Sequence, residues 1–200
     1  MVRVIAGTCK GRRLKTPPDW PGRPTADRVK EALFNILAPV LAGSIFLDLF
    51  AGTGNVGIEA LSRGAGKVFF VEKDRRAVKI IFENLTALSL MAGARVLPQD
   101  VFAALKRLAG NGERFDLIFL DPPYERRLEL PTIEKIAGYG LLVPGGVVIA
   151  ESSKREVLPP RVNSLVLERQ EKYGDTMLSF FREPISEDGG RHVRYNSWAV

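Results

Sequence analysis

The fold is decided by the stretch Phe46-Leu47-Asp48-Leu49-Phe50-Ala51-Gly52-Thr53-Gly54-Asn55-Val56-Gly57. An apolar run ends at an acid, Asp48, and a glycine-rich turn then opens a helical stretch. The glycines of this turn fit the pattern G-x-G-x-x-G: Gly52, Gly54 and Gly57. That pattern lets the backbone approach a ligand closely at the N-terminus of a helix. It predicts a site for a nucleotide-like ligand without saying which one.

Outside this stretch, short apolar runs alternate with amphipathic segments. The predicted strands are Ile45–Asp48, Lys67–Glu72, Ala94–Gln99, Phe115–Asp121 and Val147–Glu151. The predicted helices lie near Asn55–Arg63, Arg75–Leu88, Val101–Leu108 and Pro131–Tyr139. Continuous apolar runs such as 117–120 suit strands that are covered on both faces, as in a parallel sheet.

The two ends of the chain have other patterns. The pieces Val2–Ile5 and Arg13–Lys15 predict a small hairpin, and the proline-rich residues 16–24 predict a linker without regular structure. Thr25 is then expected to cap a helix that Pro39 ends. Near the other end, the segments Val162–Tyr173 and Thr176–Arg182 predict an antiparallel hairpin, because Gly174-Asp175 between them is typical of a tight turn.

These elements predict an α/β, Rossmann-like fold with a mostly parallel seven-stranded sheet and a C-terminal antiparallel hairpin. Three parts are expected: a basic N-terminal hairpin extension with its linker (1–24), a main domain (25–182) and a polar tail (183–200).

Composition narrows the class of protein. The chain is 46% hydrophobic and 26% charged, which is typical of a soluble globular domain. The N-terminus lacks the apolar core of a signal peptide, and no apolar run approaches the length of a membrane span. The single cysteine, Cys9, excludes an internal disulfide and a cysteine-cluster zinc site. We therefore expect a cytoplasmic protein that makes no membrane contact.

The basic groups are unevenly distributed. Residues 1–30 hold eight basic groups, Lys30 among them, and two acidic ones, whereas the other 170 residues hold 21 of each. The formal net charge of +6 therefore comes from one N-terminal region. This asymmetry indicates an anionic partner, with nucleic acid the leading candidate, or a solvated basic face without a partner.

Acids follow several of the predicted parallel strands: Asp48, Glu72, Asp100 and Asp121. The carboxyl ends of parallel strands form the ligand edge of such sheets. Four carboxylates there would repel one another unless a ligand brought cations or hydrogen-bond donors, as adenosine linked to a sulfonium amino acid does. Glu72 is spaced to hold ribose hydroxyls, and Asp100 to accept from an adenine amine while Val101 and Phe102 cover the ring. The alternative for each acid is a helix cap or turn residue.

A second motif, Asp121-Pro122-Pro123-Tyr124, ends the fourth strand. The prolines fix the backbone and remove two donors, so that the turn presents acceptors only. A carboxylate, a carbonyl and an aromatic ring suit a planar nucleobase with an exocyclic amine. Two acceptors can direct the amine lone pair at an activated methyl group, without a strongly perturbed general base. The alternative is a strand exit stiffened by proline.

Together, the glycine loop and the D-P-P-Y motif resemble motifs I and IV of S-adenosylmethionine-dependent N-methyltransferases that act on nucleobase amines. Three further stretches narrow the resemblance: R-V-I-A-G (3–7), R-P-T-A-D-R-V-K-E-A-L-F-N (23–35) and G-I-E-A-L-S-R-G (57–64). With them, residues 2–182 resemble the RsmD family, which methylates N2 of a guanine in 16S ribosomal RNA.

The resemblance implies a role for each matching residue. The flipped guanine would be received by the catalytic residues Asp121, Pro122, Pro123 and Tyr124. The cofactor S-adenosyl-L-methionine would be bound by Asp48, Phe50, Ala51, Gly52, Gly54, Glu72, Lys73, Asp100 and Val101, with Thr25 and Asn35 near its mouth. RNA phosphates would be held by Arg3, Lys10, Arg12, Arg13, Arg23 and Arg28. No metal is implied. The expected partner is 16S ribosomal RNA or the assembled small subunit, bound by a monomer.

Three alternatives remain. An NAD-dependent oxidoreductase would share the glycine pattern and Glu72, but gives no reason for Asp48 or for D-P-P-Y. A DNA adenine or cytosine amino-methyltransferase would share both motifs and differs chiefly in its target; we expect no separate target-recognition domain in this sequence. A non-catalytic RNA-binding module would explain the basic N-terminus alone.

Overall fold

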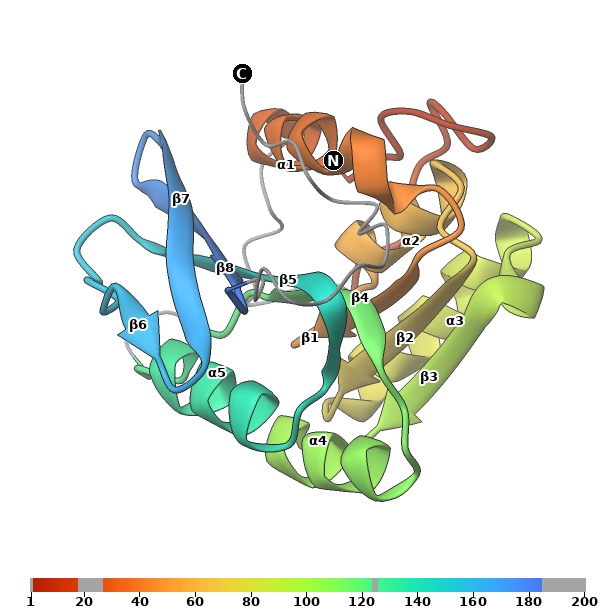
Figure 1. The fold of residues 1–200 in the computed structure, drawn as a ribbon. Helices are drawn as coiled ribbons and strands as arrows, with labels where there is room; N and C mark the ends of the chain where they lie inside the picture. Colours follow the sequence, from red (N-terminus) through yellow and green to blue (C-terminus); the bar gives the residue numbers. More distant parts are fainter. Residues whose placement is uncertain (1, 18–26, 124–125, 185–200) are drawn as a thin grey trace.

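The computed structural model describes residues 2–17, 27–123 and 126–184. Within these ranges eight strands form one sheet, in the order β3-β2-β1-β4-β5-β8-β7-β6 (Figure 1). Their bounds are β1 Ile45–Leu49, β2 Lys67–Glu72, β3 Ala94–Pro98, β4 Phe115–Leu120, β5 Leu142–Ser153, β6 Arg161–Val162, β7 Leu165–Tyr173 and β8 Thr176–Arg182. The first five pair in parallel and the last three antiparallel, so the predicted mixed sheet is confirmed.

Helices cover both faces of the sheet. Their bounds are α1 Asp27–Leu41, α2 Asn55–Ser62, α3 Arg75–Ala87, α4 Val101–Gly110 and α5 Glu129–Gly138, with a short 3-10 turn η1 at Met91–Gly93. Figure 1 shows α1, α2 and α3 on one face and α4 and α5 on the other. This arrangement follows from the β-α-β connections, which place crossover helices over a parallel sheet.

Two predictions about elements are wrong. The segment 162–173 is not one strand, because the chain turns at Asn163, which has a φ of 54°. The turn separates the two-residue β6 from β7, and the sheet has eight strands instead of seven. Pro39 does not end α1, which continues to Leu41. In the last turn of a helix a proline removes only a single hydrogen bond, so the helix can continue around it.

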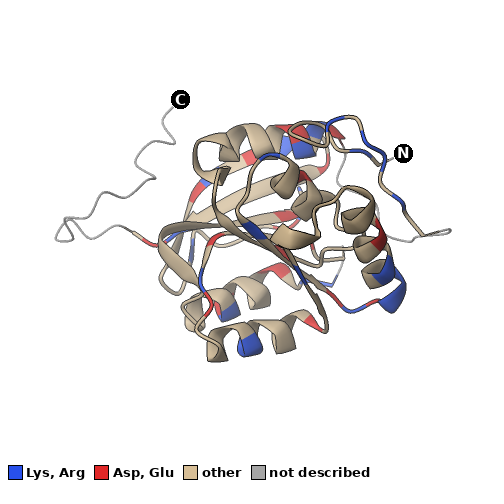
Figure 2. Ribbon diagram, turned by 90° about the vertical axis from the view of Figure 1, so that its right-hand side faces the viewer, with Lys and Arg blue, Asp and Glu red and all other residues tan. Residues whose placement is uncertain are grey.

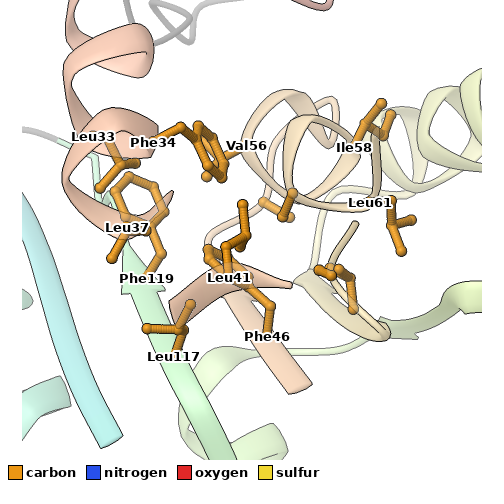
Figure 3. Close-up of a cluster of buried hydrophobic side chains, with 14 of the residues drawn as sticks. Leu33, Phe34, Leu37, Leu41, Phe46, Val56, Ile58, Leu61, Leu117 and Phe119 are labelled. Carbon is orange, nitrogen blue, oxygen red and sulfur yellow. The ribbon is translucent and has the colours of Figure 1, made fainter. Parts of the chain in front are cut away.

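The core has two parts, one on each face of the sheet. The part under α1 and α2 is shown in Figure 3, where side chains from both helices meet those of β1 and β4. Phe34 of α1 and Phe46 of β1 are both fully buried, with their ring centroids 6.5 Å apart. The apolar stripe that the sequence shows along 29–37 is the face of α1 that makes these contacts.

The N-terminal segment 2–17 packs on the outer side of α2. Its two arms pair through the bridge between Arg3 and Arg13 and through the Val4 N–H, which donates to the Arg12 carbonyl over 2.9 Å. Val2, Val4 and Leu14 lie in the same core as α1 and α2. This segment and α1 together cover the side of α2 that faces away from the sheet, and all eight residues of α2 are buried.

A buried carboxylate, Glu59 of α2, holds the segment in place. It accepts hydrogen bonds from the N–H groups of Ile5 at 2.8 Å and Ala6 at 2.9 Å. Its oxygens also lie 3.2 Å from Lys30 Nζ and 2.7 Å from Arg63 Nε. Glu59 and Lys30 are both fully buried. A buried pair of this kind fixes one arrangement of the chain, because loss of either partner leaves an uncompensated charge.

We expect the Glu59→Gln substitution to lower the free energy of unfolding by about 3–5 kcal/mol, since it leaves the Lys30 ammonium buried without its counter-charge. Glu83→Gln is the matched control: Glu83 pairs with Lys15 at 2.8 Å, but the pair lies at the surface, where the two side chains are 33% and 64% exposed. The control should cost less than about 1 kcal/mol. Urea unfolding of the three proteins measures both values, and equal losses in the two variants would contradict the role given to Glu59.

Candidate functional site

The loop between β1 and α2 has a backbone that most residues do not adopt. The φ angles of Phe50, Gly52 and Gly54 are 61°, 55° and 80°. Glycine adopts this left-handed region at little cost, whereas Phe50 is strained there. The loop is held by the Ala51 N–H, which donates to the Val71 carbonyl of β2 over 2.9 Å. The turn is therefore rigidly placed at the N-terminus of α2, where backbone N–H groups face outward.

Gly57 brings α2 close to the sheet. A Cβ atom at this position would lie 2.3 Å from the ring of Phe70 in β2. Phe70 is fully buried, so its ring has no room to move away. The third glycine of the pattern is thus required for close packing of helix on strand, the role expected of it in this motif.

Asp48, at the end of β1, is almost completely buried and accepts the Gly57 N–H at 2.8 Å. Burial raises the pKa of Asp48 from its ordinary value of 3.8 to about 7; the Gly57 hydrogen bond opposes this shift and the nearby Glu72 adds to it. A carboxyl group with such a pKa gains from any cationic group of a ligand placed beside it.

Glu72, at the end of β2, is held by two backbone donors. One oxygen accepts the Gly52 N–H at 2.9 Å, and the other accepts the Asp74 N–H at 2.8 Å. Each carboxylate oxygen can accept two hydrogen bonds, so both retain capacity for a ligand hydroxyl. The structure therefore links the predicted ribose-binding acid directly to the predicted glycine loop, 20 residues away.

Asp100 follows β3 and caps α4, because its Oδ1 accepts the Phe102 N–H at 2.9 Å. Val101 is buried in the core beneath α4, whereas Phe102 is half-buried. Of the two residues expected to cover an adenine ring, Phe102 is therefore the one whose surface is accessible for that contact. Beside Asp100, the buried Nε2 of Gln99 has no hydrogen-bond partner in the part of the chain that the structure describes.

The D-P-P-Y motif follows β4, at the same edge as the glycine loop. β4 pairs in parallel with β1, so that Leu120 lies opposite Leu49 and the two strands end side by side. Asp121 is half-buried, Pro122 is buried and Pro123 is exposed. Tyr124 lies outside the described residues. The reversal of strand order between β1 and β4 is the switch point at which sheets of this kind bind their ligands.

The remaining predicted ligand residues differ in exposure. Ala51 is buried in the loop, and Lys73 is exposed beside Glu72. Asn35 is exposed on α1. Thr25 lies outside the described residues.

The predicted RNA-binding residues that the structure describes lie at the surface, and Figure 2 shows basic positions along the chain near its N-terminus. Five of them are exposed: Arg3, Lys10, Arg12, Arg13 and Arg28. Arg23 lies outside the described residues. Two already have protein partners, Arg3 with the Asp27 carboxylate at 3.0 Å and Arg12 with the Ala87 carbonyl at 3.2 Å. Lys30, counted with the basic region, is fully buried and adds nothing to the surface charge.

Sequence reasoning missed the buried polar residues that connect the N-terminal segment to the glycine loop. Asn84 Nδ2 of α3 donates to the carbonyls of Lys15 at 3.1 Å and Thr53 at 3.3 Å. Lys30 Nζ donates to Asn55 Oδ1 at 2.7 Å and to the Arg3 carbonyl at 2.6 Å. A signal was present for Glu59, since a charge inside the apolar helix 55–62 indicates a buried partner.

None of the described helices is both long and apolar enough to cross a membrane. Likewise, no three His, Cys, Asp or Glu side chains in the described ranges are grouped so that they could hold a metal ion.

Known proteins resemble this chain over most of its length. The family Conserved hypothetical protein 95 matches residues 2–182. Ribosomal RNA small subunit methyltransferase D of Escherichia coli is 37% identical over 182 residues, covering 90% of this chain and 89% of the relative. The solved structure of yhhF from Escherichia coli superposes with a TM-score of 0.79 at 32% identity, over 91% of this chain and 97% of that one.

A more distant structure shows the same fold alone: that of SMU.776, complexed with SAH, has a TM-score of 0.63 at 17% identity. It covers 76% of this chain and 48% of that one. The predicted fold, that of the S-adenosylmethionine-dependent methyltransferases, is confirmed by these neighbours.

The raised pKa of Asp48 predicts a dependence of stability on pH. Between pH 4 and 7 the folded protein keeps a proton on Asp48 that the unfolded chain has released. The contribution of Asp48 to the free energy of unfolding therefore falls as pH rises through this window, by up to about 1.4 kcal/mol per pH unit, and is constant above pH 7. The Asp48→Asn variant keeps an acceptor for Gly57 but does not titrate. Urea unfolding at several pH values compares the two proteins, and parallel pH profiles would contradict the assignment.

Proposed function

The chain belongs to the Conserved hypothetical protein 95 family, which is the RsmD family, and from this membership we propose that it transfers a methyl group from S-adenosyl-L-methionine to ribosomal RNA. The target proposed is the exocyclic N2 amine of a guanine in 16S ribosomal RNA of the small subunit. The observation that supports the proposal is the parallel pairing of β1 with β4: the two strands end side by side, one just before the glycine loop and the other just before Asp121-Pro122-Pro123.

The donors and acceptors at the edge of the sheet fit the cofactor. Glu72 has lone pairs for ribose hydroxyls, and Asp48 would be ionised by the ammonium of the methionine moiety. Asp100 would accept from the adenine amine. The buried Gln99 Nε2, unpaired among the described residues, is a donor suited to an adenine ring nitrogen. When bound, the cofactor supplies an electrophilic methyl group on a sulfonium, which becomes a neutral thioether as the methyl leaves.

The residues of this chain would act by positioning. The Asp121 carboxylate and the Pro122 carbonyl would accept the two N–H bonds of the guanine amine and turn its lone pair toward the methyl carbon. As the N–C bond forms, positive charge develops on the nitrogen next to Asp121, which stabilises it. The methylated amine then loses its extra proton to water. Tyr124 would stack on the flipped base, whose extrusion costs less in an RNA loop than in a duplex.

The proposal is tested by transfer of labelled methyl groups. The two substrates are unmethylated small-subunit particles and protein-free 16S ribosomal RNA. We expect the purified protein to label at least one of them, and the label to map to N2 of one guanine. Label on an adenine or on double-stranded DNA instead would overturn the target. Calorimetric titration provides the second arm: S-adenosylmethionine should bind and NADH should not, and the reverse would favour an oxidoreductase.

Asp121→Ala should lower the rate of methyl transfer at least about 10²-fold, because it removes an acceptor that acts mainly in the transition state. Cofactor affinity should stay within a few-fold of the wild type, since Glu72, Asp48 and Asp100 are unchanged. Asp175→Ala, in the turn between β7 and β8, is the matched control and should retain full activity. Single-turnover rates and calorimetry separate the two effects, and a fully active Asp121→Ala protein would remove this residue from the mechanism.

A further inference from the structure

A groove of about 620 Å³ runs along the outer face of α3, beside the N-terminal segment. Its walls include three basic side chains, one acid and one exposed aromatic ring: Lys15, Arg75, Lys79, Glu83 and Phe82. None of these residues belongs to the cofactor site or to the RNA-binding residues named above.

Phe82 is the unusual member of this groove. It is 40% exposed, and is one of three large apolar side chains exposed in the described part of the chain. Its neighbour Ile81 points into the core and is fully buried. Phe82 therefore lies toward the solvent-facing side of the amphipathic α3, where charged residues are usual. Proteins that bind single-stranded nucleic acids present this arrangement: bases stack on the aromatic ring and the basic groups hold the phosphates.

Hydrogen bonds hold the N-terminal segment, which carries Lys15 and Arg12, against α3. Asn84 anchors the backbone of Lys15 on both sides, accepting its N–H at 2.8 Å and donating to its carbonyl at 3.1 Å. Lys15 Nζ lies 2.8 Å from the Glu83 carboxylate. Arg12, further along the same segment, bonds the last carbonyl of α3. The groove is thus continuous with the basic N-terminal segment, and bases outnumber acids along its walls.

One end of the groove lies near the carboxyl edge of the sheet, where the candidate cofactor site is. Arg75, the first residue of α3, lies three positions after Glu72, whose carboxylate is bonded to the glycine loop. An extended strand that lay along α3 would therefore leave the groove next to the cofactor site.

We propose that the α3 groove binds an unpaired segment of the RNA substrate, with one base stacked on Phe82 and the adjoining phosphates held by Lys15, Lys79 and Arg75. This inference rests on the proposed function for the class of substrate. The groove would give the RNA a second binding site, on α3, in addition to its contacts with the N-terminal segment. Stacking tolerates any base, so the groove positions the RNA without selecting its sequence.

The test uses the full chain and 16S ribosomal RNA transcribed in vitro, with affinity measured by titration at several salt concentrations. Phe82→Ala should weaken binding about tenfold, and Phe82→Tyr should bind like the wild type because the ring is kept. Lys79→Ala should weaken binding and flatten the salt dependence by about 0.7 in log–log slope, as expected for the loss of one phosphate contact. Lys106→Ala, an exposed lysine on α4 at the opposite face, is the matched control and should change neither value.

The outcomes separate this inference from the proposed function. Wild-type affinity in both Phe82→Ala and Lys79→Ala would overturn the groove as an RNA site, while methyl transfer by the wild type would still stand. Absence of methyl transfer by the wild type would overturn the proposed function, whereas the binding titration would still report on the groove. Self-association of the wild type that Phe82→Ala abolishes, with RNA affinity unchanged, would assign the groove to a second copy of the chain and overturn the inference.

Discussion

The buried carboxylate of Glu59 is the interaction on which the rest of the structure depends. It joins three parts of the chain that are distant in sequence: the backbone of Ile5 and Ala6, the ammonium of Lys30 in α1, and α2 itself. Removing these charges from water is costly, so the site persists only because every oxygen has partners. What the network achieves is one arrangement of α1, α2 and the N-terminal segment. Since α2 begins in the glycine loop, the same network also fixes the start of the candidate cofactor site.

Rigidity at this point has a physical reason. The glycine loop holds strained or left-handed backbone at Phe50, Gly52 and Gly54, which surrounding structure must enforce. Contacts from two directions do so. Glu72 and Val71 bond the loop from β2, while Asn84 bonds Thr53 from α3. Asn84 also bonds Lys15, so the N-terminal segment and the loop share one buried side chain. Because the loop is already ordered in the free protein, ligand binding loses little free energy in ordering it.

The sequence predicted the parallel strands to within a residue or two, apart from the longer β5, because runs such as Leu117–Leu120 are apolar on both faces and are followed by an acid. It also predicted the acids at the carboxyl edge. It failed where tertiary contacts decide the outcome. The turn at Asn163 needed a left-handed residue that carries no glycine signal, and Pro39 lies where its missing donor matters little. Lys30 looked like surface charge, because nothing local indicates that Glu59 lies over it.

The charged side chains are segregated into an acidic region and a basic region. Acids line the edge of the sheet at Asp48, Glu72, Asp100 and Asp121, whereas the N-terminal segment and the outer face of α3 are basic. A phosphate backbone is attracted to the second region and repelled by the first. A nucleobase carries no charge, and its amine donates to carboxylates. An RNA bound along the basic face can therefore present to the acidic edge only a base turned away from its backbone. On the function proposed above, the distribution of charge would therefore favour a base that is flipped out of the RNA strand.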